Sequence, residues 1–232
     1  MKLAIMQPYF LPYIGYWQLI NAVDKFVIYD DVNYINKGWI NRNNILLNKQ
    51  PFRFTLTLLG VSPNKLINEI GICENQTKLI KTFETAYTKS PYFDKIFPII
   101  KQIFEYNKKN LAKFVGNSLV RIANHLDIRT EFIYSSEMEK DCSLKGQKKI
   151  INICNKLQAG EYLNPIGGMK LYNQADFEAN HIKLRFLKTR PIEYKQFDNT
   201  FIPDLSILDV MMFNAQTEIG KTLDKYEFLD NR

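Results

Sequence analysis

KLAIMQPYFLPYIGYWQLINAVDKFVIYDD, residues 2–31, predicts how the fold begins. Residues 2–6 and 25–29 are short, nearly continuous apolar runs, which is typical of strands covered by helices on both faces. Two prolines and a glycine exclude a regular element from residues 7–15, and a helix is expected over residues 16–22. A crossover this short favours a parallel, right-handed connection between the two strands. The sequence therefore predicts an α/β fold with a parallel-rich sheet that opens with a βαβ unit.

The rest of the chain alternates helical and extended patterns. Residues 76–125 carry apolar side chains at spacings of three and four, which indicates amphipathic helices with a boundary at Ser90-Pro91. No internal repeat or low-complexity linker interrupts the chain, so we expect a single domain over residues 1–232 with the helical segment as an insertion. Further strands are expected at residues 52–58, 131–134, 161–163, 181–186 and 192–197, and further helices at residues 146–157 and 207–214.

Composition and charge exclude several classes of protein. Apolar residues make up 46% of the 232 residues and charged residues 24%, which is ordinary for a globular chain and argues against disorder. No apolar run approaches the roughly 18 residues of a membrane helix, and the short apolar start lacks a signal-peptide pattern. We therefore expect a cytoplasmic protein without membrane insertion. The net charge of +7 comes largely from scattered lysines, which favours attraction of an anionic small molecule over nucleic-acid binding.

Cysteine and histidine spacing gives no sign of a metal or triad site. The three cysteines contain no C-x-x-C pair, which argues against a disulfide framework and a zinc site. Neither His125 nor His181 has an aspartate or cysteine at ligand spacing. We therefore expect no metal ligands in this chain.

The loop after the first strand is the first candidate ligand site. In open α/β sheets, ligands bind beyond the carboxyl ends of the strands, and a nearby helix N-terminus favours phosphate. The spacing Tyr13-x-Gly15-Tyr16 is similar to the H-x-G-H signature of nucleotidyltransferases and pantothenate synthetases, which indicates a Rossmann-like opening. Both histidines are tyrosines here, and tyrosine is uncharged at neutral pH, so the analogy favours the fold over adenylyl transfer. The alternative is a tight turn with an aromatic plug. The candidate contacts are Gln7, Tyr9, Tyr13, Gly15 and Tyr16.

The polar stretch after the second strand is the second candidate. A carboxylate at a strand end suits a general base, cations suit a diphosphate, and aromatic rings suit stacking on a sugar or a base. The alternative is an ordinary exposed loop whose polar side chains cap turns. The candidates are Asp30 or Asp31 as the base, Lys37 and Arg42 for the diphosphate, Tyr34 and Trp39 for stacking, and Asn41 as a further substrate contact.

Two weaker motifs follow later in the chain. Gly167 and Gly168 come after a predicted strand and can present backbone amides to an anion, to which Lys170 adds charge. The G-x-x-x-x-G-K spacing of a P-loop is absent there. Asp204 or Ser206 precedes the last predicted helix and suits an N-cap at least as well as a ligand contact.

Four segments together resemble one protein family. They are residues 6–17 (MQPYFLPYIGYW), 30–43 (DDVNYINKGWINRN), 162–172 (YLNPIGGMKLY) and 201–209 (FIPDLSILD). In this order, and over nearly the whole chain, they resemble the WbqC-like family, whose members sit in bacterial gene clusters for O-antigen and related surface glycans such as lipopolysaccharide. The resemblance implies a role in preparing or decorating a sugar.

The function expected from these observations is amide formation on a nucleotide-linked amino sugar, by N-acyl or aminoacyl transfer. Such a reaction needs positioning of the amine, a base for its proton and donors for the tetrahedral oxyanion. The donor stays open between an acyl-CoA, an aminoacyl carrier and an acid activated with ATP, so the possible cofactors are acyl-CoA and ATP. The alternatives are a nucleotidyltransferase-like enzyme and a non-catalytic nucleotide-sugar binding protein.

Overall fold

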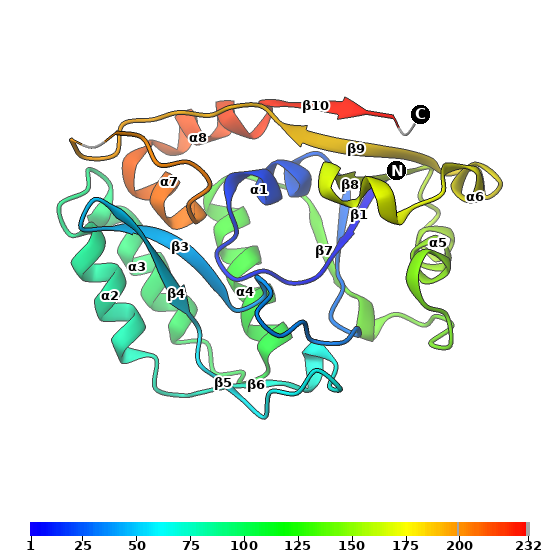
Figure 1. The fold of residues 1–232 in the computed structure, drawn as a ribbon, viewed down its shortest axis with the longest axis horizontal. Helices are drawn as coiled ribbons and strands as arrows, with labels where there is room; N and C mark the ends of the chain where they lie inside the picture. The colour runs from blue at the N-terminus through cyan, green and yellow to red at the C-terminus, as the bar shows by residue number, and fades with distance from the viewer. Residues whose placement is uncertain (199, 231–232) are drawn as a thin grey trace.

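The computed structural model describes residues 1–198 and 200–230, and six of its strands form one sheet (Figure 1). The strand order is β10-β9-β8-β1-β2-β7, and every neighbouring pair is parallel except β9 with β10. The predicted α/β fold with a parallel-rich sheet is therefore confirmed. The strands are β1 (Lys2–Met6), β2 (Lys25–Ile28), β7 (Glu131–Tyr134), β8 (Glu161–Pro165), β9 (Lys183–Thr189) and β10 (Tyr226–Leu229).

The predicted βαβ opening is also present. β1 leads through α1 (Ile14–Asn21) to β2, and the two strands run parallel with Leu3 opposite Lys25 and Met6 opposite Ile28. The helix begins at Ile14, two residues before the predicted start. β1 pairs with β2 on one side and with β8 on the other. The carboxyl ends of β1 and β8 therefore border the point at which the strand order reverses, where open α/β sheets bind ligands.

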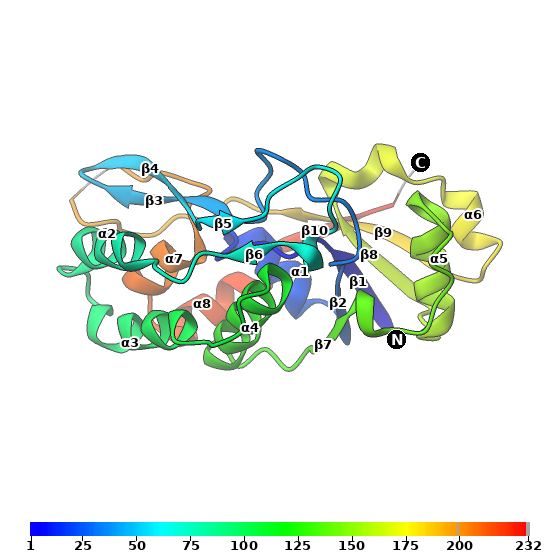
Figure 2. The same ribbon diagram turned by 90° about the horizontal axis from the view of Figure 1, so that it is seen from below.

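Helices cover both faces of the sheet, which explains the continuous apolar runs of its central strands. Ala4 of β1 belongs to a buried cluster with residues of α1 and α4 (Leu111–His125), whereas Leu3 and Ile5 pack with α5 (Gly146–Lys156) and α6 (Gln174–Glu178). Figures 1 and 2 show α4 and α5 on opposite sides of the sheet. The other helices are α2 (Thr77–Tyr87), α3 (Phe93–Phe104), α7 (Ile207–Phe213) and α8 (Gln216–Leu223), and the 3-10 turns are η1 (Ile67–Glu69), η2 (Ser135–Glu137) and η3 (Ile166–Leu171).

The helical segment predicted over residues 76–125 consists of α2, α3 and α4, and Ser90-Pro91 separates the first two. Its buried side chains, such as Phe83 and Phe114, belong to the same cluster as α1. Within the described part of the chain, no helix combines the length and the apolar character needed to cross a membrane.

A hairpin outside the main sheet lies beside α2 (Figure 1). It consists of β3 (Arg42–Leu47) and β4 (Gln50–Thr55), paired antiparallel. The strand predicted over residues 52–58 corresponds to β4, but β3 was not predicted. A further short pair, β5 (Leu58–Leu59) with β6 (Gly71–Ile72), follows the hairpin.

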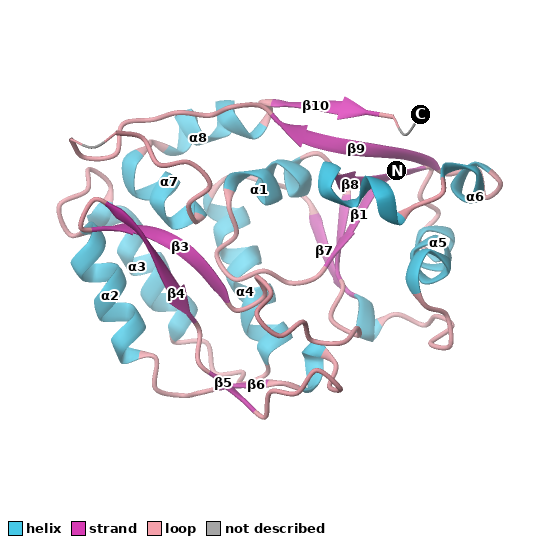
Figure 3. Cartoon of the chain, viewed as in Figure 1, coloured by secondary structure: helices cyan, strands magenta, loops and turns pink. Residues whose placement is uncertain are grey.

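The strand predicted over residues 192–197 is wrong. The described part of the chain between β9 and α7 contains no helix or strand (Figure 3). Its polar side chains bind inward instead: Tyr194 Oη and Gln196 Nε2 donate hydrogen bonds of 2.7 and 2.8 Å to Asp209 Oδ1. Tyr87 Oη donates to Asp209 Oδ2 at 2.8 Å, so the fully buried carboxylate has donors on both oxygens. The segment is therefore held by side-chain hydrogen bonds, not by the backbone hydrogen bonds that a strand makes with a neighbouring strand.

The loop after β1 is fixed by side chains from distant segments. Leu11 lies in the left-handed region with φ of 48°, and its side chain is fully buried. Its carbonyl oxygen accepts hydrogen bonds from Asn43 Nδ2 at 2.7 Å and from Ser206 Oγ at 2.8 Å. Ser206 Oγ also caps α7 by accepting from the amide of Leu208, as predicted for this residue. The loop, β3 and the start of α7 are therefore tied together at one carbonyl.

Replacing Ser206 with alanine tests this tie. We expect Ser206→Ala to lower the free energy of unfolding by about 1–3 kcal/mol, because it removes a helix cap and leaves the Leu11 carbonyl one partner short. Urea denaturation followed by circular dichroism measures the change. The exposed Ser143 provides the matched control, since Ser143→Ala should change stability by less than about 0.5 kcal/mol. Equal effects of the two variants would contradict the role of Ser206.

Candidate functional site

A cavity lies where β1 and β8 end. Its volume of about 680 Å³ falls within the range of small-molecule sites. Most of its lining comes from the loop after β1, the end of β8 with η3, and the segment around Trp39, and Tyr29 after β2 and Ile150 of α5 complete it. Because ligands of open α/β sheets bind at this position, the cavity is the candidate functional site.

The cavity brings together many of the residues that the sequence predicts as substrate contacts. They come from three separate motifs, in the loop after β1, in the stretch before β3 and in η3. The residues of the prediction that line it are Gln7, Tyr9, Tyr13, Tyr16, Trp39, Gly167 and Gly168.

One wall of the cavity is a row of aromatic rings that runs from the surface into the core. Trp39 is 47% exposed, and its ring centroid lies 6.2 Å from that of Tyr9. Tyr9 contacts Tyr16 edge-on at 5.8 Å, and Tyr16 contacts the buried Phe26 at 5.4 Å. Tyr16 Oη donates to the carbonyl oxygen of Gln7 at 2.8 Å, which fixes its ring against the loop. This wall offers flat apolar surface for a sugar or a base.

The tyrosines of the cavity are neutral at physiological pH. Burial raises the pKa of Tyr9, Tyr16 and Tyr29 well above the ordinary value, and it raises the pKa of Tyr13 and Tyr172 as well. These hydroxyl groups therefore donate hydrogen bonds and do not act as bases at neutral pH.

Asn164 is a polar lining residue that the sequence analysis does not single out. Its side chain is 6% exposed, and its Nδ2 donates to Tyr162 Oη at 2.8 Å and to Tyr172 Oη at 3.3 Å. Asn164 lines the cavity, and its Oδ1 lies against Gly168 of η3. Its position directly after the predicted strand at residues 161–163 could have indicated a ligand contact, because ligands bind beyond the carboxyl ends of such strands.

Gly168 and Gly15 make room for neighbouring protein side chains. A side-chain carbon at Gly168 would overlap Asn164 Oδ1, and one at Gly15 would overlap the Tyr13 ring and Thr189 Oγ1. Nothing lies within 4 Å of such a carbon at Gly167, which lines open space. Both Gly167 and Gly168 line the cavity, but only a side chain at Gly167 would meet open space.

Asp30 and Asp31 lie behind the cavity wall and are not among its lining residues. Asp30 is fully buried and accepts hydrogen bonds from the amide of Ser136 at 2.9 Å and from Ser136 Oγ at 2.6 Å. Asp31 Oδ2 forms ion pairs of 2.9 Å with both Lys140 Nζ and Lys149 Nζ, whose side chains are 1% and 8% exposed. Both lysines therefore pair with the one carboxylate of Asp31, while Ser136 binds the carboxylate of Asp30. This cluster attaches the end of β2 to the segments that follow β7.

The remaining predicted residues lie outside the cavity lining. Tyr34 Oη donates to Asn41 Oδ1 at 2.9 Å, and Asn41 Nδ2 donates to the Leu56 carbonyl at 2.9 Å, so both residues brace the segment before β3. Ser206 is fully buried at the α7 cap. The others are Lys37, Lys170 and Asp204, which are exposed, and Arg42, which is half-buried beside Trp39.

Metal ligation finds no support among the described residues. No group of three or more His, Cys, Asp or Glu side chains in residues 1–198 and 200–230 is placed to share a metal ion.

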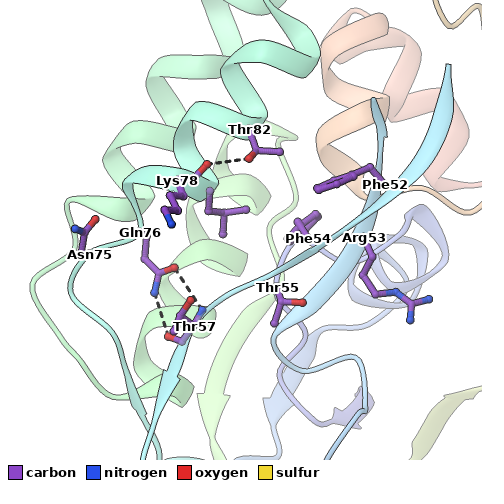
Figure 4. A pocket seen from close by; sticks show the side chains of 10 residues that line it. Phe52, Arg53, Phe54, Thr55, Thr57, Asn75, Gln76, Lys78 and Thr82 are labelled. Carbon is purple, nitrogen blue, oxygen red and sulfur yellow. Dashed lines mark hydrogen bonds between the residues drawn. The ribbon is translucent and has the colours of Figure 1, made fainter. Parts of the chain in front are cut away.

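A second depression lies between β4 and α2 (Figure 4). Its volume is about 470 Å³. The amide of Gln76, its most central polar group, already bonds Thr57: Nε2 donates to the Thr57 carbonyl at 3.0 Å and Oε1 accepts from the Thr57 amide at 3.4 Å. The depression is also remote from the strand ends of the main sheet, so it is a weaker candidate.

Replacing Asp31 tests its anchoring role. Burial raises the pKa of Asp31, but the neighbouring Ser135 hydroxyl group and the ammonium groups of Lys149 and Lys140 outweigh this and lower the pKa below its usual value. The stability that Asp31 contributes is therefore fully present above the unfolded-state pKa of about 3.9 and is lost as pH falls through the lower folded-state pKa. We expect Asp31→Asn to cost about 3 kcal/mol at neutral pH and to unfold with less dependence on pH below about 4.

Urea denaturation at several pH values measures both effects. Asp198→Asn, at an exposed position without a recorded ion pair in the described chain, is the matched control. If Asp31→Asn behaved like this control, the anchoring role would be refuted.

Two comparisons with known proteins find similar sequences. The chain is 27% identical over 222 residues to "Uncharacterized protein Rv1507c" of Mycobacterium tuberculosis (strain ATCC 25618 / H37Rv), which covers 94% of this chain and 95% of that protein. No solved structure matches the chain. The model of the WbqC-like protein family matches residues 7–221, a span that contains the loop after β1, the segment around Trp39 and η3. The chain therefore belongs to the WbqC-like protein family.

Proposed function

We propose that the protein binds a nucleotide-linked amino sugar in the cavity between β1 and β8 and forms an amide on its amino group, in the biosynthesis of a bacterial surface glycan. The observation that carries the proposal is the position of an aromatic-walled cavity of about 680 Å³ at the point where the strand order reverses. Its size and lining suit a nucleoside or sugar ring.

The side chains divide into stacking and hydrogen-bonding groups. Tyr9 and Trp39 provide the flat surface for the ring of the ligand. Asn164 Oδ1 accepts a hydrogen bond from the sugar amine or a neighbouring hydroxyl group. The neutral hydroxyl groups of Tyr13 and Tyr29 donate to an oxygen that becomes negative during the reaction.

In the proposed reaction, the amine nitrogen bonds to the carbonyl carbon of an activated acyl donor, the donor's leaving group departs with its bonding electron pair, and the nitrogen loses one proton. Neither Asp30 nor Asp31 reaches the cavity, so a base role for either residue requires its present hydrogen bonds to open. We propose instead that both carboxylates act as positioning residues behind the wall, and that the proton passes to water at the exposed mouth beside Trp39.

A second candidate function is non-catalytic binding of a nucleotide-sugar. One observation favours it: the described lining residues include no Asp, Glu, His or Cys. These residue types, with lysine and tyrosine, are the usual proton acceptors of enzymes, and the tyrosines of the cavity are protonated at neutral pH.

Ligand binding is expected to stabilise the folded protein. A UDP- or dTDP-linked amino sugar at 100 times its dissociation constant should add about 2.7 kcal/mol, which raises the melting temperature by about 5–10 °C. Asn164→Ala should reduce this shift, because the ligand loses an acceptor, whereas Asn107→Ala at an exposed site should leave it unchanged. Thermal denaturation with and without the ligands measures the shift. Its absence with every nucleotide-sugar would contradict both candidate functions.

Product analysis separates the two candidates. We expect mass spectrometry to detect an N-acylated sugar when the protein is incubated with a bound nucleotide-linked amino sugar and either an acyl-CoA or ATP with an amino acid. Asn164→Ala should lower the rate by about tenfold if its oxygen orients the amine. Binding without product in any of these mixtures would favour the non-catalytic candidate.

A further inference from the structure

We propose that Arg42 and Arg53 form the site for the phosphate groups of the ligand, on the two-stranded hairpin at the mouth of the cavity, with Trp39 between them and the interior. The inference rests on the proposed function and deepens it, because it states which end of the ligand lies outward. Arg53 belongs to none of the motifs that the sequence analysis identifies.

The hairpin places the two guanidinium groups on one aromatic ring. Arg42 lies opposite Thr55, and Arg53 lies opposite Asn44, so the two arginines are diagonal neighbours on the same face of the β3–β4 ladder. Arg42 Cζ lies 5.8 Å from the centroid of the Trp39 ring, and Arg53 Cζ lies 5.4 Å from the same centroid. Two positive charges thus converge on a single half-exposed side chain.

Neither charge is neutralised by the protein. Among the ion pairs of the described residues, none includes Arg42 or Arg53. Each uses only its Nε in a recorded hydrogen bond, Arg42 to the Gly38 carbonyl at 2.7 Å and Arg53 to Asn44 Oδ1 at 3.3 Å. In this part of the chain, the terminal amino groups of both side chains therefore remain available for an external anion.

The positive charges of Arg42 and Arg53 also act on the residues that line the cavity. Trp39 and Tyr9 both line it, and their ring centroids are 6.2 Å apart. Burial raises the pKa of Tyr9, and the charges of Arg42 and Arg53 act in the opposite direction, so both guanidinium groups lie within electrostatic reach of its hydroxyl group. Arg53 also borders the depression between β4 and α2, and Figure 4 shows its guanidinium directed away from α2.

The chemistry of this arrangement fits a phosphate or diphosphate group. A guanidinium group donates two parallel hydrogen bonds to phosphate oxygens, and two such groups on a rigid hairpin match two linked phosphates. A nucleotide-sugar carries its diphosphate between two ring systems. With the diphosphate on Arg42 and Arg53, one of those rings reaches past Trp39 and Tyr9 into the cavity.

Tryptophan fluorescence measures binding at this site directly. The chain has two tryptophans, and Trp17 is fully buried, so a ligand at the arginines changes chiefly the emission of Trp39. We would titrate the full chain with pyrophosphate, UDP, dTDP and the uncharged nucleoside uridine at low and high salt. We expect the diphosphates to bind more tightly than uridine and to weaken as salt increases.

The variants Arg42→Gln and Arg53→Gln should each weaken diphosphate binding by about ten- to a hundredfold and leave uridine binding unchanged. Arg42→Lys and Arg53→Lys, which keep the charge but lose the paired donors, should fall between these variants and the wild type. The exposed Arg129, which has no recorded ion pair in the described chain, provides the control Arg129→Gln. Circular dichroism checks that each variant is folded.

Three results would overturn the inference: no binding of pyrophosphate or either nucleoside diphosphate at millimolar concentration, diphosphate binding no tighter than uridine binding, or unchanged binding in both glutamine variants. Each leaves the proposed reaction open to its own test, because product formation from an amino sugar is measured separately. Conversely, arginine-dependent diphosphate binding without any amide product would support this site and contradict the proposed reaction.

Discussion

The carbonyl oxygen of Leu11 is the point on which the candidate site depends. Leu11 takes a left-handed conformation that few side chains adopt, and it stays there because Asn43 and Ser206 both donate hydrogen bonds to its carbonyl. These donors are separated from Leu11 by 32 and 195 residues of sequence. The wall that carries Tyr9 and Tyr13 is therefore held by β3 and by the cap of α7, so the site forms only when segments from most of the chain have assembled.

Charge is distributed differently behind the wall and at its mouth. The buried lysines Lys140 and Lys149 both pair with the Asp31 carboxylate, and the buried Asp209 has hydrogen-bond donors on both oxygens. Burial of a charge is costly unless it is paired in this way. Among residues 1–198 and 200–230, neither Arg42 nor Arg53 has an ion-pair partner, although both lie beside Trp39 of the cavity wall. The paired charges stabilise the frame of the site, and Arg42 and Arg53 are the charges that we propose for the phosphate groups of the ligand.

The sequence predicts the frame of this protein better than its details. Apolar runs at residues 2–6 and 25–29 predict β1 and β2, because these strands are buried on both faces and show it in their composition. The expected strand at residues 192–197 fails because its alternating residues serve the Asp209 network, and this partner is visible only in three dimensions. The resemblance to the WbqC-like family is confirmed, whereas the chemistry it implies stays a proposal.

The residues of the candidate site are likewise only partly predictable from the sequence. Loop residues next to strand ends, such as Gln7 and Tyr9, follow from the position of the first strand, and they do line the cavity. The two carboxylates that the sequence favours as a base are not among the lining residues. Ser136 binds Asp30, and two lysines more than a hundred residues away bind Asp31. The sequence does not point to Arg53, because Arg53 lies near Arg42 only through the pairing of β4 with β3, and β3 is a strand that the sequence does not predict.

The most direct test of the account is a crystal structure of the protein with a UDP-linked amino sugar. We expect ligand density between the carboxyl ends of β1 and β8, with one ring of the ligand against Tyr9 and its diphosphate beside Arg42 and Arg53. Density in the depression between β4 and α2, with the cavity between β1 and β8 empty, would contradict it.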